Sequence, residues 1–435
     1  ASELLRGEYR AKINASTMIN QSKTCHQAEI DSACELIDFW RFNTFYARQI
    51  YEDLQPTVSP SSMWNSSEVR PLEGFVFSVT PFNFSSIAAN LPSSAAIMGN
   101  TGVWKPSRNS YLSNYYLMRL MMDAGLPDGV INFIPGKASM VGDICLSHPM
   151  LAGIHFTGST AVFRNMWKDV ADNLPNLRSY PRIVGETGGK DFIVAHPNCD
   201  EKALIVALLR GAFEFQGQKC SAASRAYIPK SVWDNIKEDY CLEVSKITVG
   251  DPKDFSNFMS AVIDKKSFDN ISGYIDRAKS DSGCEVITGG EYDDSQGYFI
   301  QPTTIICSDP KYESMSEEIF GPVLSIYIYP DNEFEEVLKL CDETSEYALT
   351  GSIFATKRED IVTAQKALKY SSGNFYINDK PTGAVVGQQP FGGARGSGTN
   401  DKAGSPLNLL RWVSPRSIKE TFAPPHDWTY GFLNE

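Results

Sequence analysis

Short apolar runs alternate with longer stretches of helical spacing through the first half of this chain. The predicted strands are 75–79, 102–104, 130–134 and 153–156, and the predicted helices are 86–98, 111–124 and 160–174. Strands and helices that alternate at this spacing predict a doubly wound parallel sheet. Such a sheet binds its ligand at the carboxyl ends of the strands.

The alternation starts again after Lys190. The predicted strands there are 192–195, 225–228, 323–329 and 352–354, with helices at 201–215 and 333–341. The chain has 435 residues, more than one ordinary domain. We therefore expect two α/β units with a site in the cleft between them.

Three segments lie outside the two series. Residues 2–50 have helical spacing with few breakers, so a helical layer is expected there. Residues 55–71 are rich in proline and serine and predict a loop or hairpin excursion. The tail, 411–422, favours a strand that pairs outside both cores.

The composition is that of an ordinary globular protein, with 42% hydrophobic and 21% charged residues. A net charge of −12 argues against a nucleic-acid partner, which needs a basic surface. An anionic substrate stays possible, because local arginines and backbone amides bind carboxylates within an acidic protein.

No membrane or metal site is expected. Residues 74–104 carry no charge, which is long enough to suggest a span of about 20 apolar residues, but prolines and asparagines interrupt them. A buried strand–loop–helix–strand unit is the better interpretation. The nine cysteines are scattered without a CxxC pair, which favours a reducing compartment, and the five histidines form no zinc motif. Residues 1–24 do not form a signal peptide.

The candidate chemistry lies in two segments. Segment 185–190 (GETGGK) places a carboxylate among glycines, and segment 217–221 (GQKCS) places a thiol after a lysine. A thiolate attacks a carbonyl, and a carboxylate activates the water that later releases the product. Lys219 is expected to lower the pKa of the Cys220 thiol from its free value of roughly 8.5.

These segments and several others resemble the aldehyde dehydrogenase superfamily over nearly the whole chain. The other matching motifs are TPFNF at 80–84, WKPS at 104–107, FTGS at 156–159 and EEIFGP at 317–322. Two later stretches, GNFYINDK at 373–380 and GQQPFGGAR at 387–395, narrow the resemblance to the proline-catabolic branch of the family.

The resemblance implies a fold and a domain plan. The fold is α/β, with a Rossmann-like NAD-binding domain, an α/β catalytic domain and a small β oligomerisation flap. The implied boundaries are 1–54, 72–187 and 397–410 for the NAD-binding domain, 188–396 for the catalytic domain, and 55–71 with 411–435 for the oligomerisation segment. It further implies family elements ahead of residue 1, a homodimer, and a mitochondrial matrix address in a eukaryote or a cytoplasmic one otherwise.

Three residues match the catalytic positions of the family. Cys220 is implied as the nucleophile, Glu186 as the general base, and Asn83 as a donor to the oxyanion beside the Cys220 N–H. Each has a structural alternative: a buried cysteine, a carboxylate paired with Lys190, and a turn asparagine.

The cofactor evidence differs from the usual dinucleotide fingerprint, because no GxGxxG follows a predicted strand. Instead a helix opens directly after FTGS, which suits a pyrophosphate. The resemblance implies a cofactor site made of Thr80, Lys105, Ser107, Gly158, Ser159, Thr160, Ala161, Val162, Glu318 and Phe320. Arg108 stands where many NAD-using relatives carry an acidic residue, so NAD is expected and NADP is possible.

The resemblance also implies the substrate, L-glutamate γ-semialdehyde, which is oxidised to L-glutamate through a thiohemiacetal and a thioester. The implied substrate-binding residues are Phe84, Lys219, Ser221, Gly383, Ala384, Phe391 and Glu35. Glu35 is assigned to the substrate amino group, with a solvent-facing carboxylate as its alternative. Three other functions stay open: a dehydrogenase for another semialdehyde, a thioesterase that needs no cofactor, and a noncatalytic protein on this fold.

Overall fold

Five parallel strands form the sheet of the first lobe in the computed structural model, which describes residues 1–433. Their order is β4-β3-β2-β5-β6. The bounds are β2 (Phe75–Val79), β3 (Thr101–Lys105), β4 (Ile131–Phe133), β5 (Leu151–Thr157) and β6 (Arg182–Glu186). The helices are α5 (Ser85–Ile97), α6 (Tyr111–Asp123), α7 (Ala138–Ser147) and α8 (Thr160–Asn173). The predicted parallel sheet is confirmed, and the uncharged stretch is the buried β2-α5-β3 unit.

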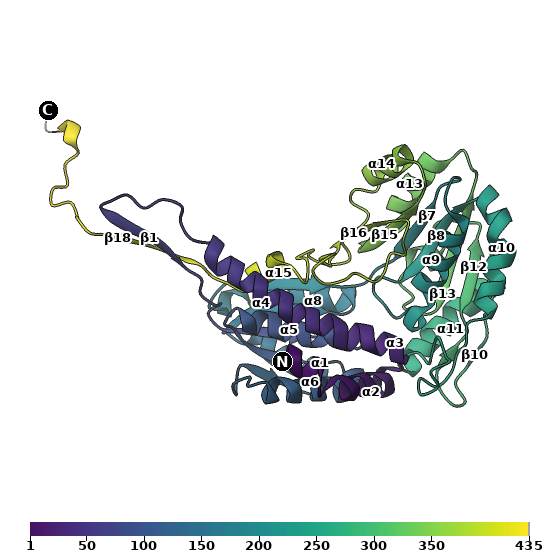
Figure 1. Ribbon diagram of the computed structural model, residues 1–435, viewed down its shortest axis with the longest axis horizontal. Coiled ribbons are helices and arrows are strands. Elements are labelled where there is room, and N and C mark those ends of the chain that lie inside the picture. Colours follow the sequence, from purple (N-terminus) through teal and green to yellow (C-terminus); the bar gives the residue numbers. More distant parts are fainter. Residues whose placement is uncertain (434–435) are drawn as a thin grey trace.

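The second lobe contains a seven-stranded sheet in the order β16-β15-β7-β8-β13-β12-β9. All neighbours are parallel except the edge strand β9 (Cys284–Thr288). The other strands are β7 (Asp191–Ala195), β8 (Ala223–Pro229), β12 (Thr303–Cys307), β13 (Val323–Tyr329), β15 (Thr350–Phe354) and β16 (Asn374–Ile377). Figure 1 shows this lobe in teal and green beside the first.

Helices cover both faces of the second sheet, so each face has its own core. One core contains side chains of α11 (Lys265–Ser280), α13 (Phe334–Glu343) and α14 (Arg358–Ala367). The other contains side chains of α9 (Glu201–Phe213) and α10 (Lys230–Ser245). Burial on both faces explains why these strands read as continuous apolar runs in the sequence.

A helical layer formed by the N-terminal residues packs on the first lobe, as the helical spacing predicted. Its elements are α1 (Ser2–Arg6), α2 (Arg10–Gln21), α3 (Cys25–Ala28), a π-helical turn (Glu29–Cys34) and α4 (Glu35–Asp53). Residues of this layer share a core with Ala88, Trp104 and Leu117. The layer breaks after α2, where Ser22 has a φ of 54°.

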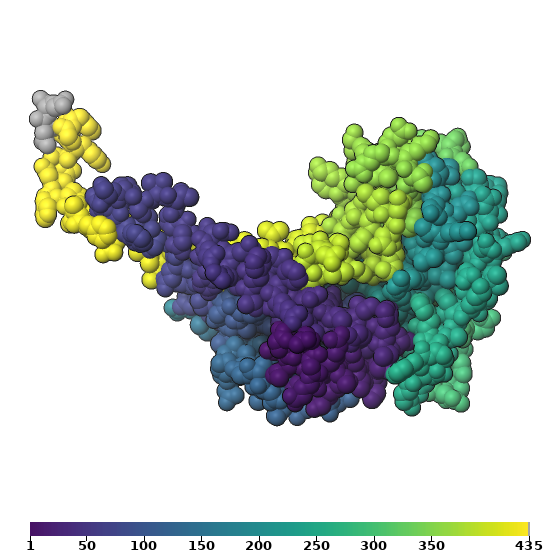
Figure 2. Space-filling model, in the orientation of Figure 1, coloured from purple at the N-terminus to yellow at the C-terminus, as the bar shows by residue number. Residues whose placement is uncertain are grey.

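A two-stranded ribbon projects from the first lobe as a thin arm (Figures 1 and 2). In this ribbon β1 (Met63–Glu68) pairs antiparallel with β18 (Arg416–Thr421). The strand predicted in the tail is confirmed. Segment 55–71 is an excursion, but its strand pairs with the far end of the chain instead of forming a local hairpin. Residues 434–435 of the predicted oligomerisation segment lie outside the described residues.

Short elements complete the chain: α12 (Glu313–Ser316), α15 (Pro406–Leu410), and two strand pairs, β10 (Tyr292–Asp293) with β11 (Phe299–Ile300) and β14 (Tyr347–Ala348) with β17 (Ala394–Arg395). The segment after β17 crosses the end of β6, where Gly398 forms an antiparallel bridge with Glu186. None of the helices in residues 1–433 is long and apolar enough to cross a membrane.

Candidate active site

A cavity of about 340 Å³ lies between the N-terminal helical layer and the two lobes. It brings together residues that are far apart in the sequence. Nine of the predicted site residues line it: Glu35, Phe84, Glu186, Lys219, Cys220, Ser221, Gly383, Ala384 and Phe391. All seven predicted substrate-binding residues are in this set, together with two of the three predicted catalytic residues.

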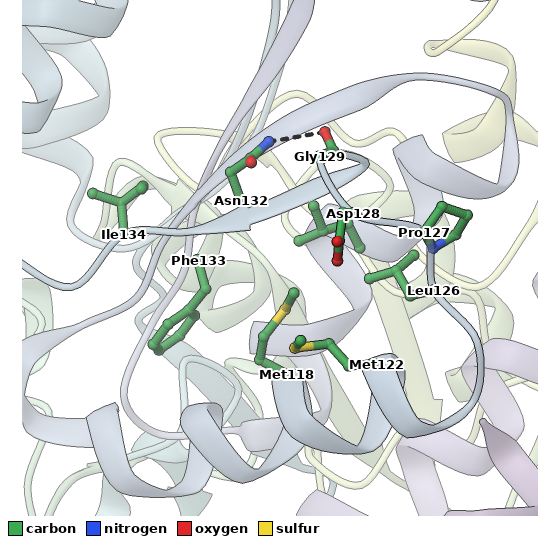
Figure 3. Close-up of a pocket in the computed structure, with 10 residues that line it drawn as sticks. Met118, Met122, Leu126, Pro127, Asp128, Gly129, Asn132, Phe133 and Ile134 are labelled. Carbon is green, nitrogen blue, oxygen red and sulfur yellow. Dashed lines mark hydrogen bonds between the residues drawn. The ribbon is translucent and has the colours of Figure 1, made fainter.

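A second hollow of about 320 Å³ lies between α6 and β4 (Figure 3). Met118 and Met122 on α6 face the strand there, and Phe133 lies opposite them. Asp128 is the one ionisable residue of its lining, and the lining contains no thiol. This hollow therefore offers a single carboxylate and no thiol nucleophile, and the candidate chemistry belongs to the first cavity.

Cys220 follows a tight turn at Glu214–Gly217 in the second lobe. Gly217 has a φ of 63°, and a Cβ there would lie 2.1 Å from the carbonyl oxygen of Gly321, so this position requires glycine. Phe215 and Gln216 also have left-handed φ values, 51° and 55°. The turn ends with the half-buried Cys220 thiol facing the cavity.

The expected effect of Lys219 on the thiol is wrong. The Lys219 ammonium lies 3.2 Å from a carboxylate oxygen of Glu214, which neutralises its charge. Burial raises the pKa of Cys220 well above its usual value, and the carboxyl groups of Glu186 and Asp191 raise it further. The thiol of this structure is therefore protonated, and its attack requires a base.

Glu186 is the carboxyl group best placed to be that base. It ends β6 and lines the cavity. Burial raises the pKa of Glu186 to about 8, the Lys402 ammonium opposes this shift, and Asp401 adds to it. The alternative of an ion pair with Lys190 is wrong, since the Lys190 Nζ is buried without a hydrogen-bond partner among the described residues.

Asn83 does not line the cavity but contacts the segment that carries the thiol. Its side-chain Nδ2 donates a hydrogen bond to the carbonyl oxygen of Gln218 at 3.1 Å. Asn83 lies in the turn between β2 and α5, and 4% of its surface is exposed. An amide NH₂ has two hydrogens, so one N–H stays available beside the nucleophile segment.

The far end of the cavity is suited to an anion. Gly383 has a φ of 96°, which only glycine adopts without strain. The Ser221 hydroxyl lies 2.8 Å from the Thr382 hydroxyl, so both are held at this end. Phe84 and Phe391 line the apolar wall.

Glu35 is half-buried in the cavity wall, and the alternative of a solvent-facing carboxylate is wrong. Burial raises the pKa of Glu35 to about 8, and the nearby Asp31 contributes. The Ser86 hydroxyl donates a hydrogen bond to it. A cationic group of a ligand beside Glu35 would lower this pKa and favour the carboxylate form.

Sequence reasoning missed several residues of the cavity, among them Asp31 and His155. Asp31 lies four residues before Glu35, a helical spacing that would have placed both on one face. Burial lowers the pKa of His155 to about 4, and its Nδ1 lies 3.0 Å from the carbonyl oxygen of Leu91. His155 is therefore neutral and does not replace Glu186 as the base.

The predicted cofactor residues lie at the carboxyl ends of β2, β3 and β5, with two from the second lobe. Thr80 accepts a hydrogen bond from the Trp104 indole at 2.9 Å, and Ser107 begins the turn after β3. Residues 158–162 lead into α8, where the Ser159 hydroxyl accepts a hydrogen bond from the Val162 N–H. This arrangement is the usual dinucleotide position in a doubly wound sheet.

The second lobe faces this site with Glu318. A Glu318 carboxylate oxygen accepts a hydrogen bond from the Gly189 N–H at 2.8 Å, and burial raises the pKa of this carboxyl group to about 7. Phe320 packs edge-on against Phe82, with ring centroids 5.9 Å apart.

These residues fit a dinucleotide. Gly158 has no side chain, and a Cβ there would lie 2.8 Å from the ring of Phe156. The backbone of this turn is therefore uncovered at the place where a phosphate would approach. The start of the 14-residue helix α8 adds a positive dipole end. Within residues 1–433 no three His, Cys, Asp or Glu side chains gather in a way that would hold a metal ion.

Arg108 lies next to this site and forms an ion pair across the lobes. Its Nη2 is 3.6 Å from a carboxylate oxygen of Asp264, and 76% of its side chain is exposed. The Asn109 side chain donates to the same oxygen at 2.9 Å. A carboxylate thus stands beside Arg108 after all, supplied by the second lobe.

Comparisons with known proteins agree with the geometry. The model of the aldehyde dehydrogenase family matches residues 1–418. The chain is 55% identical over 435 residues to "Delta-1-pyrroline-5-carboxylate dehydrogenase, mitochondrial" of Dictyostelium discoideum. This alignment covers 100% of this chain and 78% of that protein. It is 49% identical over 434 residues to the Homo sapiens protein of the same name, and this alignment covers 100% of this chain and 77% of that protein.

A solved structure is similar along the same length. The "Crystal structure of the Delta-pyrroline-5-carboxylate dehydrogenase from Mycobacterium tuberculosis bound with NAD" matches with a TM-score of 0.95 and 53% sequence identity. The match covers 99% of this chain and 79% of that one.

Proposed function

Since the chain belongs to the aldehyde dehydrogenase family, we propose that it oxidises L-glutamate γ-semialdehyde, the open form of 1-pyrroline-5-carboxylate, to L-glutamate. The observation that carries this proposal is one cavity that holds the Cys220 thiol, the Glu186 carboxyl group and the Gly383–Ala384 turn. The names of the relatives and the NAD in the mycobacterial structure support it.

The first step is addition of Cys220 to the aldehyde. Glu186 in its carboxylate form takes the thiol proton, and the sulfur forms a bond to the carbonyl carbon. The Asn83 side chain and the Cys220 N–H donate to the oxygen as it gains negative charge. A pKa of about 8 leaves Glu186 mostly protonated near neutral pH, and it makes the smaller carboxylate fraction a stronger base toward the thiol.

The second step is release of the product. NAD, when bound, supplies the hydride acceptor that oxidation of the thiohemiacetal to the thioester requires. Glu186, after it has released the thiol proton to solvent, takes a proton from a water molecule that attacks the thioester carbonyl. The carbon–sulfur bond breaks, L-glutamate leaves, and the departing thiolate takes the proton from Glu186, which restores the Cys220 thiol.

Substrate selection follows from the two ends of the cavity. We assign the α-carboxylate to the backbone amides of Gly383 and Ala384 and to the Ser221 hydroxyl, with Lys219 beside them. We assign the α-ammonium to Glu35. Phe84 and Phe391 line the aliphatic stem.

The first lobe is proposed to hold the cofactor. The residues predicted for the NAD-binding domain, 1–54, 72–187 and 397–410, include the five-stranded sheet. The residues predicted for the catalytic domain, 188–396, include the seven-stranded sheet. The assigned cofactor contacts are the strand-end residues Thr80, Lys105 and Ser107, the turn Gly158, Ser159, Thr160, Ala161 and Val162, and Glu318 with Phe320. NAD is preferred over NADP in this proposal, because Asp264 neutralises Arg108. An Asp264→Asn variant tests this through the ratio of the dissociation constants of the two dinucleotides.

The assembly is proposed to be a homodimer formed through the ribbon of β1 and β18. An isolated two-stranded sheet is marginal in water, and here all six residues of β18 are exposed, so a second copy is the natural cover. In a eukaryote we place the protein in the mitochondrial matrix, which the names of its relatives support, and otherwise in the cytoplasm.

The deciding experiment follows the absorbance of reduced cofactor with 1-pyrroline-5-carboxylate and NAD or NADP. Cys220→Ala is expected to abolish it, while Cys241→Ala, which changes a thiol on α10, keeps it. A panel of aldehydes with and without the α-amino-carboxylate separates this substrate from other semialdehydes. A folded wild-type protein that oxidises no aldehyde would overturn the proposal in favour of a noncatalytic role, and ester hydrolysis alone would indicate a thioesterase.

A further inference from the structure

Lys23 is a fully buried lysine that the mechanism above does not use. It lies in the break between α2 and α3, and 0% of its surface is exposed. Burial of an ammonium without compensation is strongly unfavourable, so its surroundings must stabilise it.

Three groups surround the Lys23 ammonium. Its Nζ lies 2.5 Å from a carboxylate oxygen of Asp31, which belongs to the cavity wall. The same Nζ lies 4.3 Å from the ring centroid of Phe84 and 4.1 Å from that of Phe215. The cation is therefore held between the faces of two aromatic rings, an arrangement that attracts strongly where water is excluded.

The two rings belong to the two segments that meet at the thiol. Phe84 directly follows Asn83 in the first lobe, and Phe215 lies in the turn that leads to Cys220 in the second lobe. Lys23 thus contacts a neighbour of the oxyanion donor and a neighbour of the nucleophile at the same time.

The turn at Phe215 needs external support. Phe215 and Gln216 both have left-handed backbone angles, which are strained for residues other than glycine. The Gln216 side chain donates to the carbonyl oxygens of Ser22 at 3.0 Å and Ala261 at 2.9 Å. The Ser22–Lys23 pair therefore holds this turn at two successive residues.

The same break also holds the other segment. The Gln21 side chain donates to the carbonyl oxygen of Phe82, and the Ser85 hydroxyl donates to the Gln21 side-chain oxygen at 3.1 Å. Asn83 lies between these two anchors, with Lys23 over the ring of Phe84 beside it.

We propose that Lys23 is a positioning residue that acts through the rings of Phe84 and Phe215. By holding both rings, it keeps the Asn83 amide in register with the Gln218 carbonyl and so with the Cys220 thiol. Lys23 itself does not line the cavity. The inference rests on the proposed function and adds to it a residue on which stabilisation of the oxyanion depends.

The test is a double-mutant cycle of kcat with Lys23→Met, Asn83→Ala and the double variant. We expect Asn83→Ala to lower kcat about 10²–10³-fold. Lys23→Met should lower kcat at least about tenfold, with KM for the semialdehyde within about threefold of wild type. If Lys23 acts through Asn83, the double variant is slower than Asn83→Ala by at most about threefold.

A buried charge pair with one member removed is a folding risk, so a charge-neutral variant accompanies the first. Lys23→Met/Asp31→Asn keeps both shapes and enters the same cycle. Lys23→Arg retains the cation and should keep more of kcat than Lys23→Met. Ile275→Val changes a buried core residue of α11 and is the structural control. It should lower the melting temperature without changing kcat.

Two results would overturn the inference: an unchanged kcat in the Lys23 variants, or losses that multiply in the double variant. Turnover of 1-pyrroline-5-carboxylate by the wild type, measured in the same assay, tests the proposed function separately. If the wild type does not oxidise it, the cycle is run on hydrolysis of p-nitrophenyl acetate by Cys220, whose oxyanion needs the same donor.

Discussion

The side-chain amide of Asn83 donates a hydrogen bond across the cleft to the carbonyl oxygen of Gln218, 3.1 Å away. Asn83 belongs to the first lobe and Gln218 to the second, two residues before the thiol. The position of the proposed oxyanion donor relative to the nucleophile is therefore set by how the two lobes pack. A change at the lobe interface should reach the chemistry through this contact.

Asn83→Ala is expected to lower kcat about 10²–10³-fold with little change in KM, because the lost donor serves the charge that develops in the transition state. Asn132→Ala is the matched control, since its side chain binds backbone carbonyls at the far edge of the first sheet. Steady-state kinetics of both variants check this. A loss of less than tenfold for Asn83→Ala would argue against its assigned role.

Lys402 and Asp401 are expected to shift the pH profile in opposite directions. Loss of the Lys402 cation favours the neutral form of Glu186 and raises its pKa, whereas loss of the Asp401 anion lowers it. The acid limb of the profile of kcat against pH should therefore move to higher pH in Lys402→Met and to lower pH in Asp401→Asn. Shifts of the same sign in both variants would exclude Glu186 as the group that the profile reports.

Glu186 should also make the folded protein less stable as the pH rises. Burial raises its pKa from 4.5 to about 8, so between these values the folded state keeps a proton that the unfolded state has released. The stability from this group is present in full below about pH 4.5 and is lost as the pH rises through about 8.

The variant Glu186→Gln removes this dependence. Denaturant midpoints measured across this range should fall less steeply with pH than those of the wild type. Glu238→Gln, on the exposed face of α10, is the control and should keep the wild-type slope. A Glu186→Gln slope equal to that of the wild type would mean that Glu186 is ionised at neutral pH.

Gly383→Ala should raise KM for the semialdehyde about tenfold, because the strain of a side chain at a φ of 96° displaces the proposed carboxylate site. An aldehyde without an α-amino-carboxylate should show no such change. Gly129→Ala is matched for strain, since Gly129 has a φ of 81° and open space around it, far from the cavity. Equal changes for both aldehydes would show that Gly383 affects catalysis in general.

The proposed dimer interface at the ribbon can be tested by a substitution of Ile418, which lies on β18 and is 38% exposed. Ile418→Arg places a charge on the face that a second copy would cover, so the molar mass from light scattering should fall toward that of one chain. Ser417→Arg changes the neighbouring residue, whose side chain points to the opposite face of the ribbon. Dissociation by both variants, or by neither, would contradict an interface built on the Ile418 face.

Several features of the fold were readable from the sequence because each follows from local physics. The strands of both sheets are continuous apolar runs, since sheets buried on both faces require them. The nucleophile segment was recognisable from the family motif at 217–221, and the structure shows why Gly217 stands there, since a Cβ would lie 2.1 Å from the Gly321 carbonyl oxygen. The β6 strand was missed, because it is short and carries Arg182 and Glu186 at its ends.

What the sequence did not reveal depends on contacts between distant segments. The sequence predicts that Lys219 lowers the pKa of the thiol, but in the structure the Glu214 carboxylate neutralises the Lys219 ammonium. Nothing in the sequence around Lys23 marks it as buried, and only the packing of three segments around it shows its burial. Ion pairs and burial of this kind are set by tertiary structure, which leaves no periodic signal along the chain.

The pairing of β1 with β18 has a consequence for synthesis of the protein. Met63 leaves the ribosome well before its partner Thr421, because most of both lobes lies between them in the chain. Both lobes can fold while translation continues, whereas β1 must wait without a partner until β18 has been made. Pairing of the ribbon is therefore a late step in folding. Truncated chains that lack β18 should stay as monomers in which the edge of β1 is unpaired.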